Sequence, residues 1–229
     1  MHTASSPRRR SRYWSPILLA LATGVSACGG GGGSDTPDAS APDAAPDAAP
    51  DARPTFACDD ADPATSLLGV PGVISASEEP CGNYIQGAAR CFSVGFEQPV
   101  QHTSPGQTFV QMLQVVHRGC DKPTVIADWG YSLFPVFYED SVSYLYDANA
   151  INVEHRFQGG SLPDTWDWTA LTIANGAADQ HEIINSLRGL YTDRWISTGA
   201  SKGGVTALYH HYLYPNDLDG TVPLVAPAS

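Results

Sequence analysis

The stretch RWISTGASKGGVTALYHHYLYP, residues Arg194–Pro215, decides the fold. Its first five residues predict a short strand, and the residues from Lys202 to the proline predict a helix. Between them lies Ser201, with Gly199 and Gly203 two residues away on either side. A serine on a sharp strand-to-helix turn is typical of a nucleophile elbow, where the tight turn leaves no room for flanking side chains. We therefore predict that Ser201 is a nucleophile toward acyl groups; the alternative is a serine that caps the following helix.

Attack by Ser201 would create an oxyanion, which needs hydrogen-bond donors already in place. The backbone N–H of Lys202, at the start of the helix, is one candidate. The second donor is expected from the loop that follows the buried-type strand at residues 123–128. Because Gly130 lets the backbone approach closely there, we predict the backbone N–H of Tyr131. The alternative is that this loop is an ordinary turn, whose aromatic residues pack against the rest of the protein and whose backbone binds no oxyanion.

Strand and helix patterns alternate along most of the chain. Strands are expected at residues 91–96, 108–117, 123–128, 150–157, 194–198 and 221–226, after a loop-rich stretch that reaches Pro80. A long helix is expected at residues 165–190, capped by Asp164 or Thr165. On the helix after the elbow, the residues expected to face inward are Val205, Leu208, Tyr209 and Tyr212. This order predicts an α/β fold with a mostly parallel sheet and flanking helices.

Functional residues in such sheets gather beyond the carboxyl ends of the strands, where the segments 129–131, 154–156 and the elbow all fall. We predict that Glu154, His155 and Arg156 form a buried, hydrogen-bonded support under the floor of the site. The acidic and histidine residues at 179, 181 and 182 are expected on a solvated helix face, because their spacing does not suit zinc. No metal site is predicted.

The N-terminus has the pattern of an export signal. Four arginines at positions 8–12 precede an apolar segment, and small residues lead to Cys28. Residues 1–27 are therefore predicted to be a signal peptide of the bacterial lipoprotein type, with lipid attached to Cys28. A plain secretory peptide is the alternative. Gly29 after the cysteine is compatible with outer-membrane sorting in a bacterium with two membranes, so we expect an exported protein anchored at the cell surface or in the periplasm.

Residues 28–55 are predicted to be a solvated tether between this anchor and a single domain at residues 56–229. Five glycines are followed by three tandem APDA repeats, a composition that lacks apolar surface for a core. The domain contains four further cysteines, Cys58, Cys81, Cys91 and Cys120. Because disulfides persist in exported proteins, we expect two of them, with the pairing left open. Zinc is the less favoured alternative, since there is no C-x-x-C pair.

The charge of the chain argues against nucleic acid or an anionic membrane as an electrostatic partner. The formal net charge is −12, and removal of the four N-terminal arginines would take it to −16.

Two separated blocks carry a resemblance to a known family. They are EHRFQGGSLPDTWDW with LTIANGAADQH (154–181), and WISTGASKGGVTALYHHYLYPNDLDGTVPLVAP (195–227). Over about residues 91–229 the chain resembles the secreted bacterial tripeptidyl and prolyl aminopeptidases of serine peptidase family thirty-seven, and more distantly the prolyl carboxypeptidases. The resemblance implies an α/β-hydrolase fold, no cofactor, peptide substrates, and a Ser-Asp-His triad whose nucleophile matches Ser201.

The chain departs from this pattern after Ser201. In α/β-hydrolases the acid and the histidine follow the serine. The residues available here are His210 and His211, expected on solvated helix surface, and Asp217 and Asp219, expected in a turn. The sequence therefore resembles the first part of such an enzyme, cut after the strand that follows the elbow. We expect negligible activity from this chain alone, which would be a truncated product, a fragment created by a shift of the reading frame, or one part of a split gene whose C-terminal half is encoded separately. The alternatives are an inactive surface lipoprotein that serves as an interaction module and, less favoured, an esterase.

Overall fold

The computed structural model describes residues 55–104 and 106–227. The predicted signal peptide, Cys28 and all but the last residue of the predicted tether lie outside these ranges. No helix within the described ranges is both long and apolar enough to cross a bilayer.

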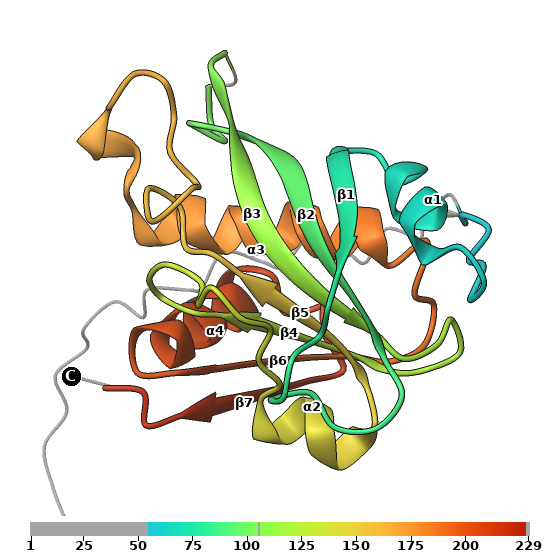
Figure 1. Cartoon of the computed structure of the whole chain (residues 1–229). Helices are drawn as coiled ribbons and strands as arrows, with labels where there is room; N and C mark the ends of the chain where they lie inside the picture. The colour runs from blue at the N-terminus through green and yellow to red at the C-terminus, as the bar shows by residue number, and fades with distance from the viewer. Residues whose placement is uncertain (1–54, 105, 228–229) are drawn as a thin grey trace, which may run out of the picture. The chain divides into compact units, whose positions relative to one another are not determined.

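A single sheet forms the centre of the domain (Figure 1). Its strands, in chain order, are β1 (Val73–Glu79), β2 (Arg90–Pro99), β3 (Thr108–His117), β4 (Thr124–Asp128), β5 (Asn149–Val153), β6 (Trp195–Ala200) and β7 (Gly220–Leu224). Their spatial order is β1-β2-β3-β5-β4-β6-β7. The pairings β1/β2, β2/β3 and β3/β5 are antiparallel, whereas β5/β4, β4/β6 and β6/β7 are parallel. All strands except β1 and β3 therefore run in one direction, and the predicted α/β class with a mostly parallel sheet is confirmed.

Helices cover both faces of the sheet. They are α1 (Pro63–Leu68), α2 (Ser141–Tyr146), the 3-10 turn η1 (Trp168–Ala170), α3 (Ile173–Leu187) and α4 (Lys202–Leu213). Neighbouring residues of β4 point to opposite faces: Val125 packs with α2, and Ile126 packs in the cluster that contains α3. Because β4 and β5 are covered on both faces, all their residues are buried.

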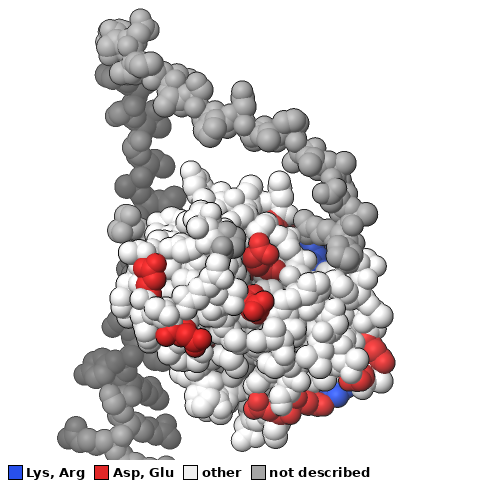
Figure 2. All heavy atoms as spheres, turned by 90° about the horizontal axis from the view of Figure 1, so that it is seen from above, with Lys and Arg blue, Asp and Glu red and all other residues white. Residues whose placement is uncertain are grey.

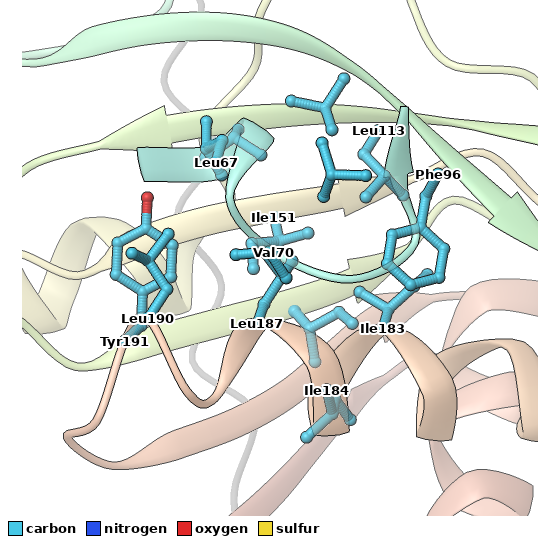
Figure 3. Close-up of a cluster of buried hydrophobic side chains, with 14 of the residues drawn as sticks. Leu67, Val70, Phe96, Leu113, Ile151, Ile183, Ile184, Leu187, Leu190 and Tyr191 are labelled. Carbon is cyan, nitrogen blue, oxygen red and sulfur yellow. The ribbon is translucent and has the colours of Figure 1, made fainter. Parts of the chain in front are cut away.

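The main core lies between the sheet and α3 (Figure 3). Ile183, Ile184 and Leu187 of α3 are fully buried against Ile151 of β5 and other apolar strand residues. Leu67 and Val70, in and just after α1, close the same cluster. This packing fixes α3 beneath the strand ends that carry the site.

The structure differs from the predicted elements in several places. The strand predicted at residues 150–157 runs from Asn149 to Val153. The stretch before Pro80, predicted as loop, contains α1 and β1. The long helix begins only at Ile173, where the Thr172 side chain accepts a hydrogen bond from the N–H of Asn175, and it ends at Leu187. Helix α2 was not predicted. It has only six residues, and its two tyrosines, Tyr144 and Tyr146, are exposed, so its sequence shows no repeating apolar face that would indicate a helix.

Two disulfides are present, as predicted, and the structure supplies their pairing. Cys58 bonds Cys120, and Cys81 bonds Cys91. The first joins the segment before α1 to the turn between β3 and β4. Within the described ranges, the one cluster of candidate metal ligands is Cys58, Asp60 and Cys120, and its two sulfurs are already joined in the disulfide.

Candidate active site

Ser201 lies between the end of β6 and the start of α4, in the predicted strand-turn-helix layout. Its backbone has φ 53° and ψ −119°, a conformation that costs a residue other than glycine about 1–3 kcal/mol. Its N–H donates to the Leu224 carbonyl at 3.0 Å, and its carbonyl accepts from the N–H of Val205 at 3.0 Å. The side chain makes no capping hydrogen bond and is exposed. Ser201 thus occupies the N-cap position of α4, but the alternative in which its side chain caps the helix is wrong.

Glycines allow this turn to touch the neighbouring strand backbone directly. A Cβ atom at Gly203 would lie 2.0 Å from the carbonyl oxygen of Asp128, at the end of β4. A Cβ atom at Gly199 would lie 2.5 Å from the carbonyl carbon of Gly203. Both contacts are with backbone atoms, which cannot swing aside. The first turn of α4 is therefore seated against the ends of β4 and β6.

The loop after β4 reaches the same place. Gly130 has φ 72°, and a Cβ atom there would lie 2.8 Å from the backbone nitrogen of Gly203. The N–H of Gly130 donates to the carboxylate of Asp128. Within the described part of the chain, no acceptor is hydrogen-bonded to the backbone N–H of Lys202 or of Tyr131. Neither N–H group predicted to bind an oxyanion is therefore used in a hydrogen bond among the described residues, and the loop that carries one of them contacts the turn that carries the other.

Glu154 joins two loops beside the site. Its Oε2 accepts from the N–H of Gly160 at 2.8 Å and from both the N–H and the hydroxyl of Ser161, at 2.9 and 2.8 Å. Its Oε1 accepts from the N–H of Leu133 at 3.0 Å. This buried carboxylate therefore fixes the loop after β5 to the loop after β4.

Arg156 is fully buried and hydrogen-bonded along its whole guanidinium group. It donates to both carboxylate oxygens of Asp179, at 2.7 and 2.6 Å, and to the carbonyls of Val100 and Ala170, at 2.8 and 2.9 Å. Asp179, predicted on a solvated face, is buried. That prediction was wrong because α3 turns this carboxylate toward the fully buried Arg156 in the loop after β5.

Asp128, which was not among the predicted site residues, connects the loop after β4 to His155 and to α3. Its buried carboxylate lies 3.1 Å from Nδ1 of His155 and 3.4 Å from Nε2 of Gln180, and it also accepts from the N–H of Gly130. His155 is buried as predicted. A carboxylate as the last residue of a fully buried strand, directly before Trp129-Gly130, was the signal that could have revealed it.

The histidines that follow Ser201 lie at the other end of α4. His210 was predicted on solvated surface but is fully buried, with Nε2 3.0 Å from the carboxylate of Asp217. Nδ1 of His181 is 2.7 Å from the same oxygen, and the Tyr214 ring stacks on His181 at 4.0 Å between centroids. Burial raises the pKa of Asp217, but hydrogen bonds from the two histidines and their charges outweigh it, so the pKa lies at about 2.

This cluster ties the end of α4 to α3 and does not serve Ser201. Eight helical residues lie between Ser201 and His210, which places the two about 13 Å apart along the helix axis. His211 is exposed as predicted, and a carboxylate oxygen of Asp219 accepts from the N–H of Trp195 at 2.8 Å.

Ser201 opens onto a groove with a volume of about 720 Å³. Its apolar walls come from Tyr131, from Ile173 at the start of α3, and from the outward side of α4, where Tyr209 and Tyr212 lie. The residues buried on α4 are instead Gly203, Gly204, Thr206, Ala207 and His210. The predicted inward face was therefore wrong: close seating of α4 requires small residues toward the sheet, which leaves its aromatic residues outside.

Acidic side chains are scattered over the face seen in Figure 2, and basic ones are sparse there.

Comparison with known proteins identifies the family. The family model described as PS-10 peptidase S37 matches residues 57–229. The chain belongs to the peptidase S37 family. This chain is also 37% identical to the prolyl tri/tetrapeptidyl aminopeptidase of Streptomyces mobaraensis. The match extends over 168 residues, which make up 73% of this chain and 34% of that protein. It thus spans about a third of the length of this relative.

Solved structures with similar folds are more distant. A peroxisomal α/β-hydrolase from Saccharomyces cerevisiae has a TM-score of 0.42 at 15% identity, covering 63% of this chain and 46% of that one. A probable hydrolytic enzyme from Pseudomonas aeruginosa has a TM-score of 0.43 at 20% identity, covering 62% and 43%. In the S37 chain itself, the strand order and the elbow between β6 and α4 are those of the α/β-hydrolase fold that the sequence predicted.

The contact at Gly203 predicts that replacing this helical glycine by alanine lowers the free energy of unfolding, whereas the same change in an ordinary helix raises it. In an ordinary helix, Gly→Ala stabilises by up to about 1 kcal/mol. Gly203→Ala should instead destabilise the S37 chain by about 2 kcal/mol or more, because the new methyl group meets the fixed Asp128 carbonyl. Urea unfolding measures the change. Gly220→Ala, where a Cβ atom meets nothing within 4 Å, is the control and should be close to neutral. An unchanged or raised stability of Gly203→Ala would contradict the close seating of α4.

The low pKa of Asp217 predicts a loss of stability in acid. Because the folded pKa, about 2, lies below the ordinary value of 3.8, this carboxylate stabilises the fold above pH ~4 and ceases to do so as the pH falls toward 2. The contribution is roughly 2 kcal/mol. Asp217→Asn should therefore be less stable than the wild type by about that amount near pH 6, and the difference should shrink toward pH 2. Urea unfolding across this range tests it, with the exposed Asp193→Asn as control. A difference that stays constant with pH would contradict the ion-pair assignment.

Proposed function

We propose that this chain carries the nucleophile and oxyanion hole of a serine peptidase that acts on the amino ends of short peptides. The observation that carries the proposal is the strained backbone of Ser201, whose hydroxyl makes no hydrogen bond among the described residues and opens onto a groove. Strain of this kind persists only where the surrounding structure enforces it, and it is concentrated at functional sites.

The chemistry follows from the geometry. The Ser201 oxygen would attack the carbonyl carbon of the scissile peptide bond while its proton passes to a general base. The backbone N–H groups of Lys202 and Tyr131 would bind the resulting oxyanion. Collapse of this intermediate would expel the amine, protonated by the same base, and leave the acyl group on Ser201. Water would then release the acyl group by the reverse proton transfers. The proposed reaction steps need no cofactor.

The general base and its acid would come from outside the described residues. His155 is directed toward Asp128, and His210 is buried with Asp217 at the far end of α4. Among the described residues, neither histidine is hydrogen-bonded to the Ser201 hydroxyl. We propose that a further segment, encoded together with this chain or separately, supplies the histidine and the acid, and that the 229-residue chain alone is inactive.

Peptides with a free amino end are the proposed substrates, and short amino-terminal units are the proposed products. Support comes from the S. mobaraensis relative, which is named a prolyl tri/tetrapeptidyl aminopeptidase. The groove next to Ser201 is lined by Tyr131, Ile173 and Tyr209, which suit an uncharged peptide segment better than a charged one.

A second candidate function rests on exposed apolar side chains. Leu208 and Tyr212 of α4, Leu224 of β7 and Val225 after it are all exposed. A surface of this kind is typical of an interaction site, so an inactive lipoprotein that binds another protein is the alternative. An esterase is less favoured, because the relative named above is a peptidase.

We also propose that the chain is an exported lipoprotein anchored through Cys28. The two disulfides support an oxidising compartment outside the cytoplasm. The anchor would hold the domain at the bacterial surface or in the periplasm, on the outer membrane where two membranes are present, with the tether as a spacer.

Peptidase activity is tested with a tripeptidyl-proline anilide that has a free amino end. We expect no turnover by the 229-residue chain alone. Together with the polypeptide encoded downstream of Ser229, we expect turnover that Ser201→Ala reduces by at least about 10³-fold. Ser132→Ala, an exposed serine in the loop after β4, is the control and should retain activity.

Two results would count against the proposal in different ways. Turnover by the chain alone, abolished in Ser201→Ala, would show that a base is already present. A folded complex that remains inactive, or the lack of any downstream polypeptide that carries a histidine and an acid, would favour the interaction module.

Lipidation is tested by expression in a bacterial host with an alkyne-tagged fatty acid. The wild type should incorporate the label and sediment with membranes, and Cys28→Ser should do neither. Cys120→Ser, which removes a disulfide cysteine instead, should still be labelled. An exported wild-type chain without label would indicate a plain secretory peptide.

A further inference from the structure

The side chain of Lys202 makes a contact that its backbone role does not require. From the first turn of α4 it reaches back to the loop after β4, where Nζ donates to the carbonyl oxygen of Gly130 at 2.6 Å. Nζ also lies 5.0 Å from the centre of the Tyr131 ring. The side chain is partly buried, so this is a charge-assisted hydrogen bond with restricted access to water.

The carbonyl that Lys202 binds belongs to the peptide group that ends in the N–H of Tyr131. A peptide group is planar, and in the trans form its oxygen and hydrogen point in opposite directions. Fixing the carbonyl of Gly130 therefore fixes the direction of the Tyr131 N–H. A cation on the oxygen also polarises the group, which makes the N–H a stronger donor.

We propose that the Lys202 side chain is a positioning residue of the oxyanion hole. It holds and polarises the Gly130–Tyr131 peptide group, while the backbone N–H of the same lysine supplies the other donor. One residue would thereby set both donors relative to Ser201. The inference rests on the proposed role of these N–H groups.

The other bonds of this loop do not replace the lysine. The N–H of Gly130 is held by Asp128, and the carbonyl of Tyr131 accepts from the N–H of His155 at 3.1 Å. These bonds fix the peptide groups on either side. For the group between them, the bond from Lys202 is the only hydrogen bond within the described ranges. The Tyr131 ring is 59% exposed and provides little anchorage. Glycine at position 130 also leaves that peptide free to rotate unless it is tied.

The sequence allows this one peptide group to be observed by NMR. Gly130-Tyr131 is the only Gly-Tyr pair in the chain. Labelling with carbonyl-¹³C glycine and ¹⁵N tyrosine therefore gives a single carbonyl–amide correlation from the 229-residue chain. In Lys202→Met, which keeps the length of the side chain but loses the charge and the donor, we expect the Gly130 carbonyl signal to move upfield and the Tyr131 amide signal to shift. Lys202→Arg should restore most of the wild-type positions.

Lys122→Met is the matched control, because Lys122 pairs with Asp147 elsewhere on the domain. It should leave the correlation in place. In the wild type, an NMR scalar coupling between the Lys202 Nζ and the Gly130 carbonyl carbon would report this hydrogen bond directly. That result does not depend on how well a variant folds. A correlation that moves no more in Lys202→Met than in Lys122→Met, or no such coupling in the wild type, would overturn the proposal.

Kinetics of the completed enzyme provide the second readout. Lys202→Met should lower kcat about 10- to 100-fold with KM unchanged, because the interaction strengthens only as the oxyanion forms. Lys202→Arg should recover most of this loss. An unchanged kcat in Lys202→Met would overturn the positioning role even if the NMR shifts appear. If the completed enzyme shows no activity at all, the peptidase proposal fails, while the NMR result still decides whether Lys202 fixes the peptide group.

Discussion

Direct backbone contact between the start of α4 and the end of β4 is the constraint on which the rest of the site depends. Gly203 has no space for a side chain because the Asp128 carbonyl occupies it. This contact sets the height of Ser201 above the sheet, and it places Lys202 next to the loop at Gly130. A residue with any side chain at position 203 would push the start of α4, and Ser201 with it, away from the end of β4 and the loop at Gly130. The glycines therefore determine geometry that the serine alone could not.

Buried charges beneath the elbow are stable only because each has a partner. An unpaired charge in a protein interior costs several kcal/mol, so the carboxylates of Asp128, Glu154 and Asp179 are each surrounded by donors. Several of these donors are backbone N–H groups of loops. The same pairing that makes burial tolerable therefore also fixes the loops around Ser201, and stability and site geometry share one set of bonds.

The sequence predicted those parts of the fold that are determined locally. The strand-turn-helix at residues 194–215 and the α/β layers were predictable, since turn glycines and apolar periods act over a few residues. The burial of His210 and Asp179 was not, because a titratable residue on a helix is exposed by default and becomes buried only when the fold brings a partner such as Asp217 or Arg156. The exposed aromatic face of α4 was misjudged for a related reason: close backbone packing overrode hydrophobicity.

For the nucleophile proposed at Ser201, position and activation are separate properties. Position depends on the strained backbone of Ser201, which costs about 1–3 kcal/mol and is held by β6, α4 and the N–H bond to Leu224. Activation requires a base that can take the proton from Oγ. A carboxylate partner does not disqualify a histidine, because the histidine of a Ser-His-Asp triad is itself bonded to a buried acid. His155 and His210 each have such a partner, Asp128 and Asp217, but among the described residues neither is hydrogen-bonded to the Ser201 hydroxyl, and His210 lies about 13 Å along α4 from it. Activation therefore requires a histidine that reaches the Ser201 hydroxyl, a position that neither of these two occupies.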